Sequence, residues 1–191
     1  MLTIVQAPNP VLSSIAKKVT RVDKNISSLI IEMEKALSSA KDPEGVGLAA
    51  PQIGKSLQIF IIKESKNDPL LTCINPVLSI PKEQKLSDDV EKKVKTKKTK
   101  ENKEVKLEGC LSLQDVWGIV KRYPEVDLTY MDENGVEQTK HFDGFLATII
   151  QHEYDHLQGI LFPRRVLEQK GQLYKSVKNK KGETEFEELV V

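Results

Sequence analysis

The chain has 191 residues, of which 39% are hydrophobic and 30% charged, and its formal net charge is +1. This length suits one domain with a substantial core, and the small net charge gives no indication of a polyanionic partner such as DNA. No apolar run is long enough to span a bilayer, and the start, MLTIVQAPNP, lacks the features of a signal peptide. We therefore expect a single cytoplasmic domain, residues 1–191, that binds neither DNA nor membrane.

The first forty residues predict two helices. Residues 25–41 carry an amphipathic pattern typical of a helix, with Asp23 or Asn25 as its N-cap and Pro43 beyond its end. Nearer the start, four apolar residues repeat at helical spacing and predict a smaller helix: Leu12, Ile15, Ala16 and Val19.

Residues 45–54, GVGLAAPQIG, form a segment rich in glycine and alanine. Such a composition indicates backbone brought close to a ligand or to another element. The segment lacks the Gly-x-Gly-x-x-Gly spacing and the preceding strand of a dinucleotide site, so a phosphate-binding role is excluded. Gln52 is its notable polar group, because a side-chain amide can donate to an oxygen. From the residues alone, a functional and a structural hydrogen bond are equal alternatives for it.

Residues 57–63 and 71–78, LQIFIIK and LTCINPVL, read as strands. Their apolar and β-branched composition is typical of a half-buried or buried sheet. Cys73 lies in the second of them, and an isolated cysteine with apolar neighbours is usually core filler.

Residues 79–106 differ in composition from the rest of the chain. Ten lysines against six acidic residues give the stretch 82–106 a formal charge of +4. Because it has almost no apolar residues it cannot build a core, and we interpret it as a flexible, solvated insertion. The functional alternative is contact with RNA phosphates of the ribosome, which the absence of interleaved arginines and aromatic residues disfavours.

The C-terminal half predicts two hairpins. Residues 119–130 and 136–142 would be the strands of the first, with its turn at 133–135, Glu-Asn-Gly. Pro163 and the two arginines after it begin a short helix or turn. Residues 173–191 then read as strands around Lys181-Gly182, and the tail EFEELVV adds an edge strand.

Residues 143–162, DGFLATIIQHEYDHLQGILF, are the stretch around which the chain is organised. They are apolar nearly all round before Gln151 and contain no internal proline, so they predict a buried helix. Asp143 is a candidate N-cap, and Gly159 stands where a C-terminal glycine is favoured. A buried helix is a rigid mount for functional side chains.

This helix carries the motif His-Glu-x-x-His. His152 and His156 are four residues apart and therefore share one helix face, with Glu153 beside them. The chain contains only 3 histidines, and two of them are here. Unpaired imidazoles and a carboxylate inside a core would carry a large desolvation cost. The motif therefore predicts a metal site with a carboxylate that carries protons.

A site of this kind needs a third protein ligand. The chain has two cysteines, Cys73 and Cys110, and in a reducing compartment a metal or catalytic role is more common than a disulfide for a cysteine with flanking chemistry. Cys110 follows Gly109 in the segment LEGCLSL at 107–113. Glycine permits close approach of the backbone at this position. The surroundings of each cysteine decide which of the two is the third metal ligand.

Three separated motifs together resemble peptide deformylase: GVGLAAPQIG at 45–54, EGCLSL at 108–113 and QHEYDHLQG at 151–159. The match extends to PNPVLSSIAKKV near the start and to INP at 74–76. The lysine-rich insertion lies outside the family pattern, and Gln114 stands where the family often has proline. The resemblance implies an α+β fold, with short, mostly antiparallel strands around a central helix and terminal helices packed outside.

The resemblance also implies one divalent metal ion per chain, held by Cys110, His152 and His156 with water as the fourth ligand. Three protein ligands and one open position are the arrangement of catalytic sites. Ferrous iron is the family's native ion, and Zn²⁺, Ni²⁺ or Co²⁺ can substitute, since a Cys-His-His set suits several divalent ions. Behind the cysteine strand, the family pattern implies an ion pair between Glu108 and Arg122.

The implied reaction is hydrolysis of the N-formyl group from the initiator methionine of newly made polypeptides, with release of formate. Glu153 would take a proton from water and deliver it to the leaving amine. The Gln52 amide and the Leu111 backbone N–H would stabilise the charge that develops on the formyl oxygen.

The substrate itself is an N-formyl-methionyl peptide. Phe145 and Ile149 precede His152 by seven and three positions and share its helix face, although a plain core role is an equal alternative for Phe145. The backbone at 45–47 could pair with an extended peptide. Five residues are expected to contact the substrate: Val46, Gly47, Gly109, Phe145 and Ile149.

Two rival hypotheses remain at this level. A zincin-type metallopeptidase would take its third ligand downstream of His156, where Glu168 is the nearest well-placed carboxylate. A non-catalytic metal-binding or ribosome-associated factor would use the lysine-rich segment as its contact. Binding alone requires neither Glu153 nor Gln52, so their presence favours an enzyme.

Overall fold

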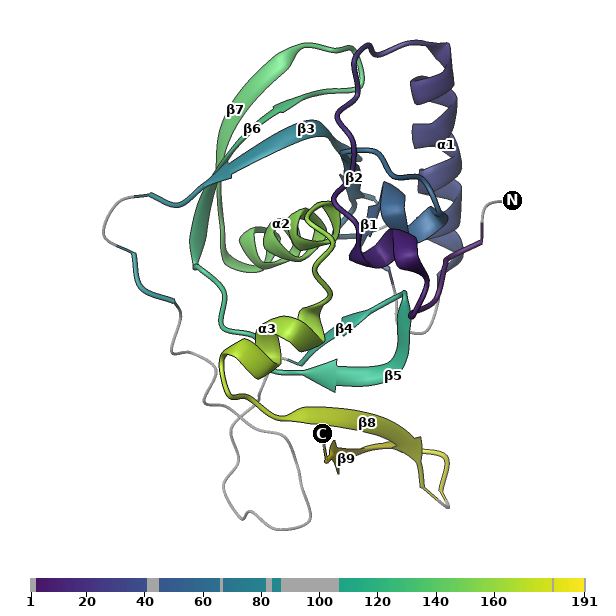
Figure 1. The fold of residues 1–191 in the computed structure, drawn as a ribbon, viewed down its shortest axis with the longest axis vertical. Coiled ribbons are helices and arrows are strands. Elements are labelled where there is room, and N and C mark those ends of the chain that lie inside the picture. The colour runs from purple at the N-terminus through teal and green to yellow at the C-terminus, as the bar shows by residue number, and fades with distance from the viewer. Residues whose placement is uncertain are drawn as a thin grey trace.

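The computed structural model describes residues 3–40, 45–65, 67–81, 84–86, 107–179 and 181–190 (Figure 1). Within these residues two antiparallel sheets surround a central helix, which confirms the predicted α+β class. The helical elements are η1 (Pro10–Ser13), α1 (Lys24–Ser39), η2 (Ala50–Ile53), α2 (Gly144–Leu157) and α3 (Phe162–Glu168), where η denotes a 3-10 helix.

The larger sheet has five strands in the order β1-β2-β3-β6-β7, and it curves around α2 in Figure 1. Among the described residues β1 pairs only with β2, so it is an edge strand of this sheet. The sheet's bounds are β1 (Gly47–Ala49), β2 (Ile59–Ile62), β3 (Leu71–Ser79), β6 (Glu125–Met131) and β7 (Glu137–Asp143).

Strand β2 shows why this sheet is apolar on both faces. Successive side chains of a strand point to opposite sides. Phe60 and Ile62 accordingly pack in the cluster that contains the apolar residues of α2, whereas Ile59 and Ile61 pack in the cluster that contains those of α1. A strand covered on both sides reads as an uninterrupted apolar run, and all four residues of β2 are buried.

The smaller sheet has the strand order β4-β5-β8-β9, and α3 lies between it and α2 (Figure 1). Its core contains Phe162 and Val166 of α3 together with Cys110 and Leu173. Helix α3 therefore joins the smaller sheet to the central helix. The strands are β4 (Glu108–Cys110), β5 (Leu113–Gly118), β8 (Leu173–Lys178) and β9 (Thr184–Leu189).

Several predicted elements are confirmed with small shifts of their ends. The helix predicted at 25–41 is α1, and Asp23 is its N-cap, since its side chain accepts hydrogen bonds from the backbone N–H of Asn25 and Ile26. The turn at 133–135 joins β6 to β7, and β8 and β9 form the C-terminal hairpin. Cys73 is fully buried in the core, as predicted.

The small helix predicted from Leu12 to Val19 is wrong beyond its first turn. Only η1 forms there, and Ile15 is 70% exposed. The backbone of Ala16 and Lys17 bonds instead to Leu157 and Ser56. Hydrogen bonds to other elements replace the local ones that a helix would need, so Leu12, Ala16 and Val19 are buried by tertiary contacts rather than on a helix face.

The hairpin strand predicted at 119–130 is wrong in its first half. β6 begins only at Glu125, and the strand β5, which the sequence analysis did not predict, ends at Gly118. The intervening backbone is held by side chains: Gln169 bonds to both the N–H and the C=O of Lys121, and Gln151 does the same at Tyr123.

The lysine-rich insertion predicted at 79–106 falls mostly outside the described residues, apart from 79–81 and 84–86. Among the described residues, no helix has both the length and the apolar character needed to cross a membrane.

Candidate active site

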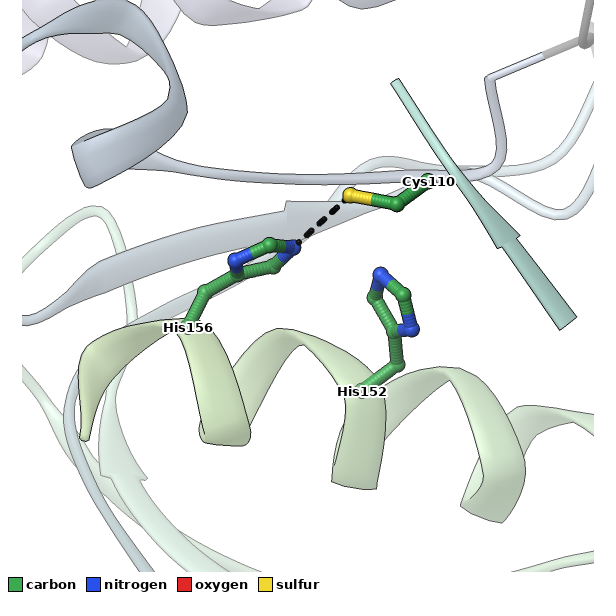
Figure 2. A group of neighbouring side chains, drawn as sticks. All are labelled: Cys110, His152 and His156. Atoms are coloured by element: carbon green, nitrogen blue, oxygen red, sulfur yellow. Dashed lines mark hydrogen bonds between the residues drawn. The ribbon is translucent and has the colours of Figure 1, made fainter. Parts of the chain in front are cut away.

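Three side chains with metal-binding atoms meet between α2 and β4, and they point toward one another in Figure 2. Cys110 Sγ lies 3.3 Å from His156 Nε2. One donor atom from each of Cys110, His152 and His156 lies within 4.8 Å of the others. The two imidazole rings have centroids 4.9 Å apart at an interplanar angle of 77°. The structure thus brings together the three residues that the sequence resemblance named.

The local structure explains how these three residues meet. The spacing of four residues places both imidazoles on one face of α2, one turn apart. Cys110 ends the short strand β4 at a register shift between Gly109 and Cys110. An added Cβ at Gly109 would lie 2.7 Å from the Trp117 ring, so only glycine lets β4 approach β5 closely enough here. Contact of the His152 ring with the Phe162 ring, stacked at 6.3 Å, supports the imidazole from α3.

The other nitrogen of His152 is fixed by Glu108. His152 Nδ1 lies 2.6 Å from Glu108 Oε1, and Arg122 donates to both oxygens of the same carboxylate, at 3.1 and 2.7 Å. Burial would raise the pKa of Glu108, but the nearby Arg122 and His152 outweigh it and lower the pKa to about 2. An ionised carboxylate only accepts, so Nδ1 carries a hydrogen, and Nε2 is the nitrogen of this ring that is available to bind a metal. The predicted ion pair between Glu108 and Arg122 is confirmed.

Asp155 extends this network on the far side of Arg122. Its Oδ2 accepts from Arg122 Nη1 at 2.6 Å, and Arg165 of α3 forms a fork with both of its oxygens, at 3.1 and 2.6 Å. The Asp155 side chain is only 7% exposed. Sequence reasoning missed both Asp155 and Arg165. A carboxylate in the last turn of a buried helix was the available signal, because it requires a cationic partner.

Glu153 is buried in a different way. It is 3% exposed, and within the described part of the chain its Oε2 has no hydrogen-bond partner. Burial raises the pKa of Glu153 to about 7. Gly47 of β1 lies directly against this carboxylate, since an added Cβ would overlap its Oε1 and approach its Cδ to 2.8 Å. The absence of a side chain at residue 47 leaves the space that the carboxylate occupies.

Gln52 and the turn after Cys110 border the same site. Gln52 is 1% exposed; its Oε1 accepts from Ala49 N–H at 2.8 Å, which directs its Nε2 to within 3.4 Å of Cys110 Sγ. The carbonyl of Leu111 accepts a hydrogen bond from Gln6 Nε2 at 3.0 Å. The N-terminal segment therefore holds the turn that contains Leu111.

The residues expected to contact the substrate lie either at the edge strands beside the site or on α2. Gly47 and Gly109 belong to β1 and β4, the edge strands that border the site, and Val46 directly precedes β1. Ile149 is buried in the main core. Phe145 is 49% exposed at the start of α2, which excludes a plain core role for it. Asp143 occupies the N-cap position of α2, but its side chain forms no capping hydrogen bond, so that expectation is wrong in its detail.

The donor set fits a divalent metal ion. A thiolate and two imidazoles are usual ligands of such ions, and the buried atoms Glu153 Oε2 and His156 Nδ1 lack partners among the described residues. The alternative third ligand, Glu168, is instead bonded to Arg164 and Arg165 on α3, at 2.9 and 3.3 Å, with 45% of its side chain exposed. The described residues therefore gather Cys110 rather than Glu168 beside the histidines.

Comparison with known proteins points to one family. The model of the family described as polypeptide deformylase matches residues 1–172. The peptide deformylase of Pseudothermotoga lettingae is 38% identical over 154 residues, which cover 81% of this chain and 76% of that protein. The peptide deformylase of Halothermothrix orenii is 36% identical over 167 residues, which cover 87% of this chain and 94% of that protein.

Solved structures agree with the sequence relatives. The peptide deformylase of Synechococcus elongatus, determined in complex with actinonin, has a TM-score of 0.68 and 36% identity, covering 86% of this chain and 78% of that one. The peptide deformylase of Thermotoga maritima also has a TM-score of 0.68, with 29% identity, and covers 86% of this chain and 97% of that one.

Proposed function

We propose residue roles for the reaction of the peptide deformylase family, to which this chain belongs. That reaction hydrolyses the N-formyl group of newly made polypeptides that begin with N-formyl-methionine, and it releases formate. The chain is a metal-dependent hydrolase of this kind.

Cys110, His152 and His156 would hold one divalent metal ion. When bound, such a cation supplies Lewis-acid chemistry and makes water more acidic. Fe²⁺ is our choice of ion, following the family resemblance, and the same donors accept Zn²⁺, Ni²⁺ or Co²⁺. The hydrogen bond between His152 Nδ1 and Glu108 supports the ligand role of His152, because it orients the ring with Nε2 toward Cys110 and His156. Metal analysis of protein purified without oxygen would identify the ion.

Glu153 would accept the proton of the attacking water and pass it to the leaving nitrogen. Two observations support this role. The Oε2 atom of Glu153 has no hydrogen-bond partner among the described residues. Burial raises the pKa of Glu153 to about 7, and a general acid or base works best when its pKa lies near the working pH. A bound cation beside it would favour the ionised form that accepts the proton.

Gln52 Nε2 and the Leu111 backbone N–H would donate hydrogen bonds to the formyl oxygen as it gains negative charge. The orientation of the Gln52 amide supports this role, because its oxygen is already committed to Ala49 N–H and its nitrogen faces the metal ligands. Loss of one such preorganised donor typically costs ~3 kcal/mol of transition-state stabilisation.

The peptide chain of the substrate would extend along β1. An edge strand can pair with an extended peptide through its free backbone groups, and β1 lies against Glu153 through Gly47. Val46 and Gly47 would then border the substrate on one side, Gly109 on another, and Phe145 and Ile149 would surround the methionine side chain. The position of Phe145 and Ile149 on α2, the helix that carries both histidines, supports their place beside the substrate.

We treat residues 1–191 as one catalytic domain that works in the cytoplasm, where new polypeptides arise. The support for one domain is that the proposed ligands come from two parts of the fold: Cys110 from β4 of the smaller sheet, and both histidines from α2. Contact of the lysine-rich segment with the ribosome stays a prediction of the sequence. Deletion of residues 84–103 with measurement of salt-dependent ribosome affinity tests it.

The observation that carries the proposal is the convergence of Cys110, His152 and His156 beside the Glu153 carboxylate, whose Oε2 has no partner among the described residues. The test is release of formate from an N-formyl-methionyl peptide by the metal-loaded protein, with Cys110→Ser assayed for both formate release and bound metal. We expect the variant to lose metal and activity together. A Cys110→Ser protein with the metal content of the wild type would remove Cys110 from the ligand set.

A further inference from the structure

Arg165 of α3 is bonded to a carboxylate that lies inside the protein. Its Nε and Nη2 donate to Asp155 Oδ2 and Oδ1 at 3.1 and 2.6 Å, a two-bonded fork that fixes the plane of the carboxylate. Asp155 lies in the last turn of α2, where the helix dipole disfavours negative charge. The buried Asp155 charge is therefore tolerated only because guanidinium groups neutralise it.

Arg122 connects Asp155 to the metal centre. Its Nη1 donates to Asp155 Oδ2 at 2.6 Å, while its Nε and Nη2 donate to the two oxygens of Glu108. A planar guanidinium held on two edges cannot rotate without breaking one set of bonds. The position of Asp155 therefore controls the orientation in which Arg122 meets Glu108.

Glu108 completes the connection by accepting from His152 Nδ1 at 2.6 Å. The chain of contacts thus runs from Arg165 through Asp155, Arg122 and Glu108 to His152. We propose that Arg165 is a positioning residue of the metal centre, which acts through these contacts on the orientation of the His152 ring. The inference rests on the proposed function, since it assumes that His152 is a metal ligand.

Arg165 contributes something that Arg122 alone cannot supply. Among the described residues, Asp155 Oδ1 is bonded to Arg165, and without that bond Asp155 would be held only through its Oδ2 by Arg122. The carboxylate could then turn about its own axis, and Arg122 would follow it. Lysine would not replace Arg165, because an ammonium group cannot form the two-bonded fork.

The neighbouring Arg164 is a matched control. It precedes Arg165 on the same helix and carries the same charge, but its side chain is 66% exposed and bonds to Glu168 rather than to Asp155. A substitution at Arg164 removes the same charge from the same helix without touching the contacts that lead to His152. Both arginines also bond to Glu168, so that contact is common to the two variants.

The experiment uses the full chain loaded with Co²⁺ and compares Arg165→Gln with Arg164→Gln. We expect Arg165→Gln to lose Co²⁺ to a chelator about tenfold faster, the low end of the range for residues that support metal ligands. The visible absorption bands of its bound Co²⁺ should also shift, because the His152 ring is reoriented. A purely structural contribution of Arg165 would lower the unfolding temperature and leave these bands in place. Arg164→Gln should match the wild type in both measurements.

A double-mutant cycle separates the contact chain from a general effect. Arg165 and Glu108 have no direct contact among the described residues, so independent effects of the two substitutions would be additive, whereas members of one hydrogen-bond network are coupled. If Arg165 acts through Glu108, Arg165→Gln in a Glu108→Gln background should accelerate Co²⁺ loss no further. Additive effects, or unshifted bands in Arg165→Gln, would overturn the proposal while formate release by the wild type leaves the proposed function intact. A wild-type protein that binds no Co²⁺ would instead overturn the proposed function.

Discussion

Glu153 and Asp155 are two residues apart on α2 and both are buried, yet their surroundings are opposite. Asp155 receives three hydrogen bonds from two arginines, whereas Glu153 keeps one oxygen without a partner among the described residues. A buried carboxylate that is fully paired holds elements together, and one that is left partly unpaired costs stability. Such a cost persists where the free oxygen is needed for chemistry.

The surroundings of Asp155 and Glu153 also differ in which parts of the protein they connect to α2. Around Asp155 the charges alternate and tie α2 to α3 and to the segment before β6, which fixes the scaffold. Around Glu153 lie the proposed metal ligands and the backbone of β1, which is close enough that residue 47 must lack a side chain. One helix therefore supplies both the rigid mount and the reactive groups.

Of the substitutions that test the difference between the two carboxylates, Glu153→Gln should have the largest effect, and that effect is on turnover. An amide of the same shape cannot carry the proton, so formate release should fall by about 10²- to 10⁴-fold, the usual contribution of a positioned acid or base. Bound metal should remain, and the unfolding free energy should stay equal or rise because a costly buried carboxyl group is removed. Normal formate release would disprove the proton-transfer role.

Asp155→Asn should lower the unfolding free energy, which Glu153→Gln leaves equal or raises. Its amide nitrogen would face a guanidinium donor, and removal of one partner from a buried ion pair typically costs about 3–5 kcal/mol of unfolding free energy. Urea unfolding measures this loss. Glu168→Gln, an exposed carboxylate bonded to arginines of α3, is the control and should change stability far less. Equal stabilities of the two variants would mean that the network does not hold the scaffold.

Gln52→Ala tests the hydrogen-bond donor proposed for the formyl oxygen. The transition state would lose one hydrogen bond worth ~3 kcal/mol, so kcat should fall by about 10²- to 10³-fold. KM should change little, because the donor acts on charge that is absent from the bound substrate. The measurement is steady-state formate release, and a rise in KM with unchanged kcat would assign Gln52 to substrate binding instead.

Gly47→Ala should move the Glu153 carboxylate without removing it. The added methyl group would overlap Oε1, and displacement of a reacting group by about 1 Å can cost about 10²-fold in rate. Gly135→Ala is the control, since residue 135 lies in the turn between β6 and β7 with a φ of +77°, and its methyl group would meet Val22, away from Glu153. It should lower stability and leave kcat of the folded protein near that of the wild type. Equal kcat values for the two variants would separate residue 47 from catalysis.

The smallest effect is expected at an exposed pair far from α2's buried carboxylates. The hydrogen bond to Asp127 raises the pKa of His141 above its ordinary value of 6.5, against the opposing effect of burial. Its stabilising contribution is therefore complete below pH 6.5 and is lost as the pH rises through the higher folded-state pKa. His141→Gln should be slightly less stable than the wild type at pH 6 and equal at pH 9, and thermal unfolding at both pH values measures the difference.

Much of the site was predictable from local pattern. The interval of four residues places His152 and His156 on one face of any helix, and the apolar residues before them require that helix to be buried. The three motifs then identified Cys110 and Gln52 through resemblance. The ends of α1 and of the C-terminal hairpin were likewise close to their predicted positions, because capping residues and turns are encoded locally.

What only the tertiary structure decided is which side chains from distant segments complete one another. Nothing in the local pattern at Asp155 or Arg165 indicates that they are joined to Glu108 through Arg122. The apolar spacing from Leu12 to Val19 predicted a helix, but backbone hydrogen bonds to Leu157 and Ser56 form there instead. Periodicity and caps act within a few residues, so the sequence determines the elements and their ligating faces. Long-range hydrogen bonds and packing form only when the chain is folded, so they determine that the Asp155 carboxylate is paired and that Glu153 keeps an oxygen without a partner among the described residues.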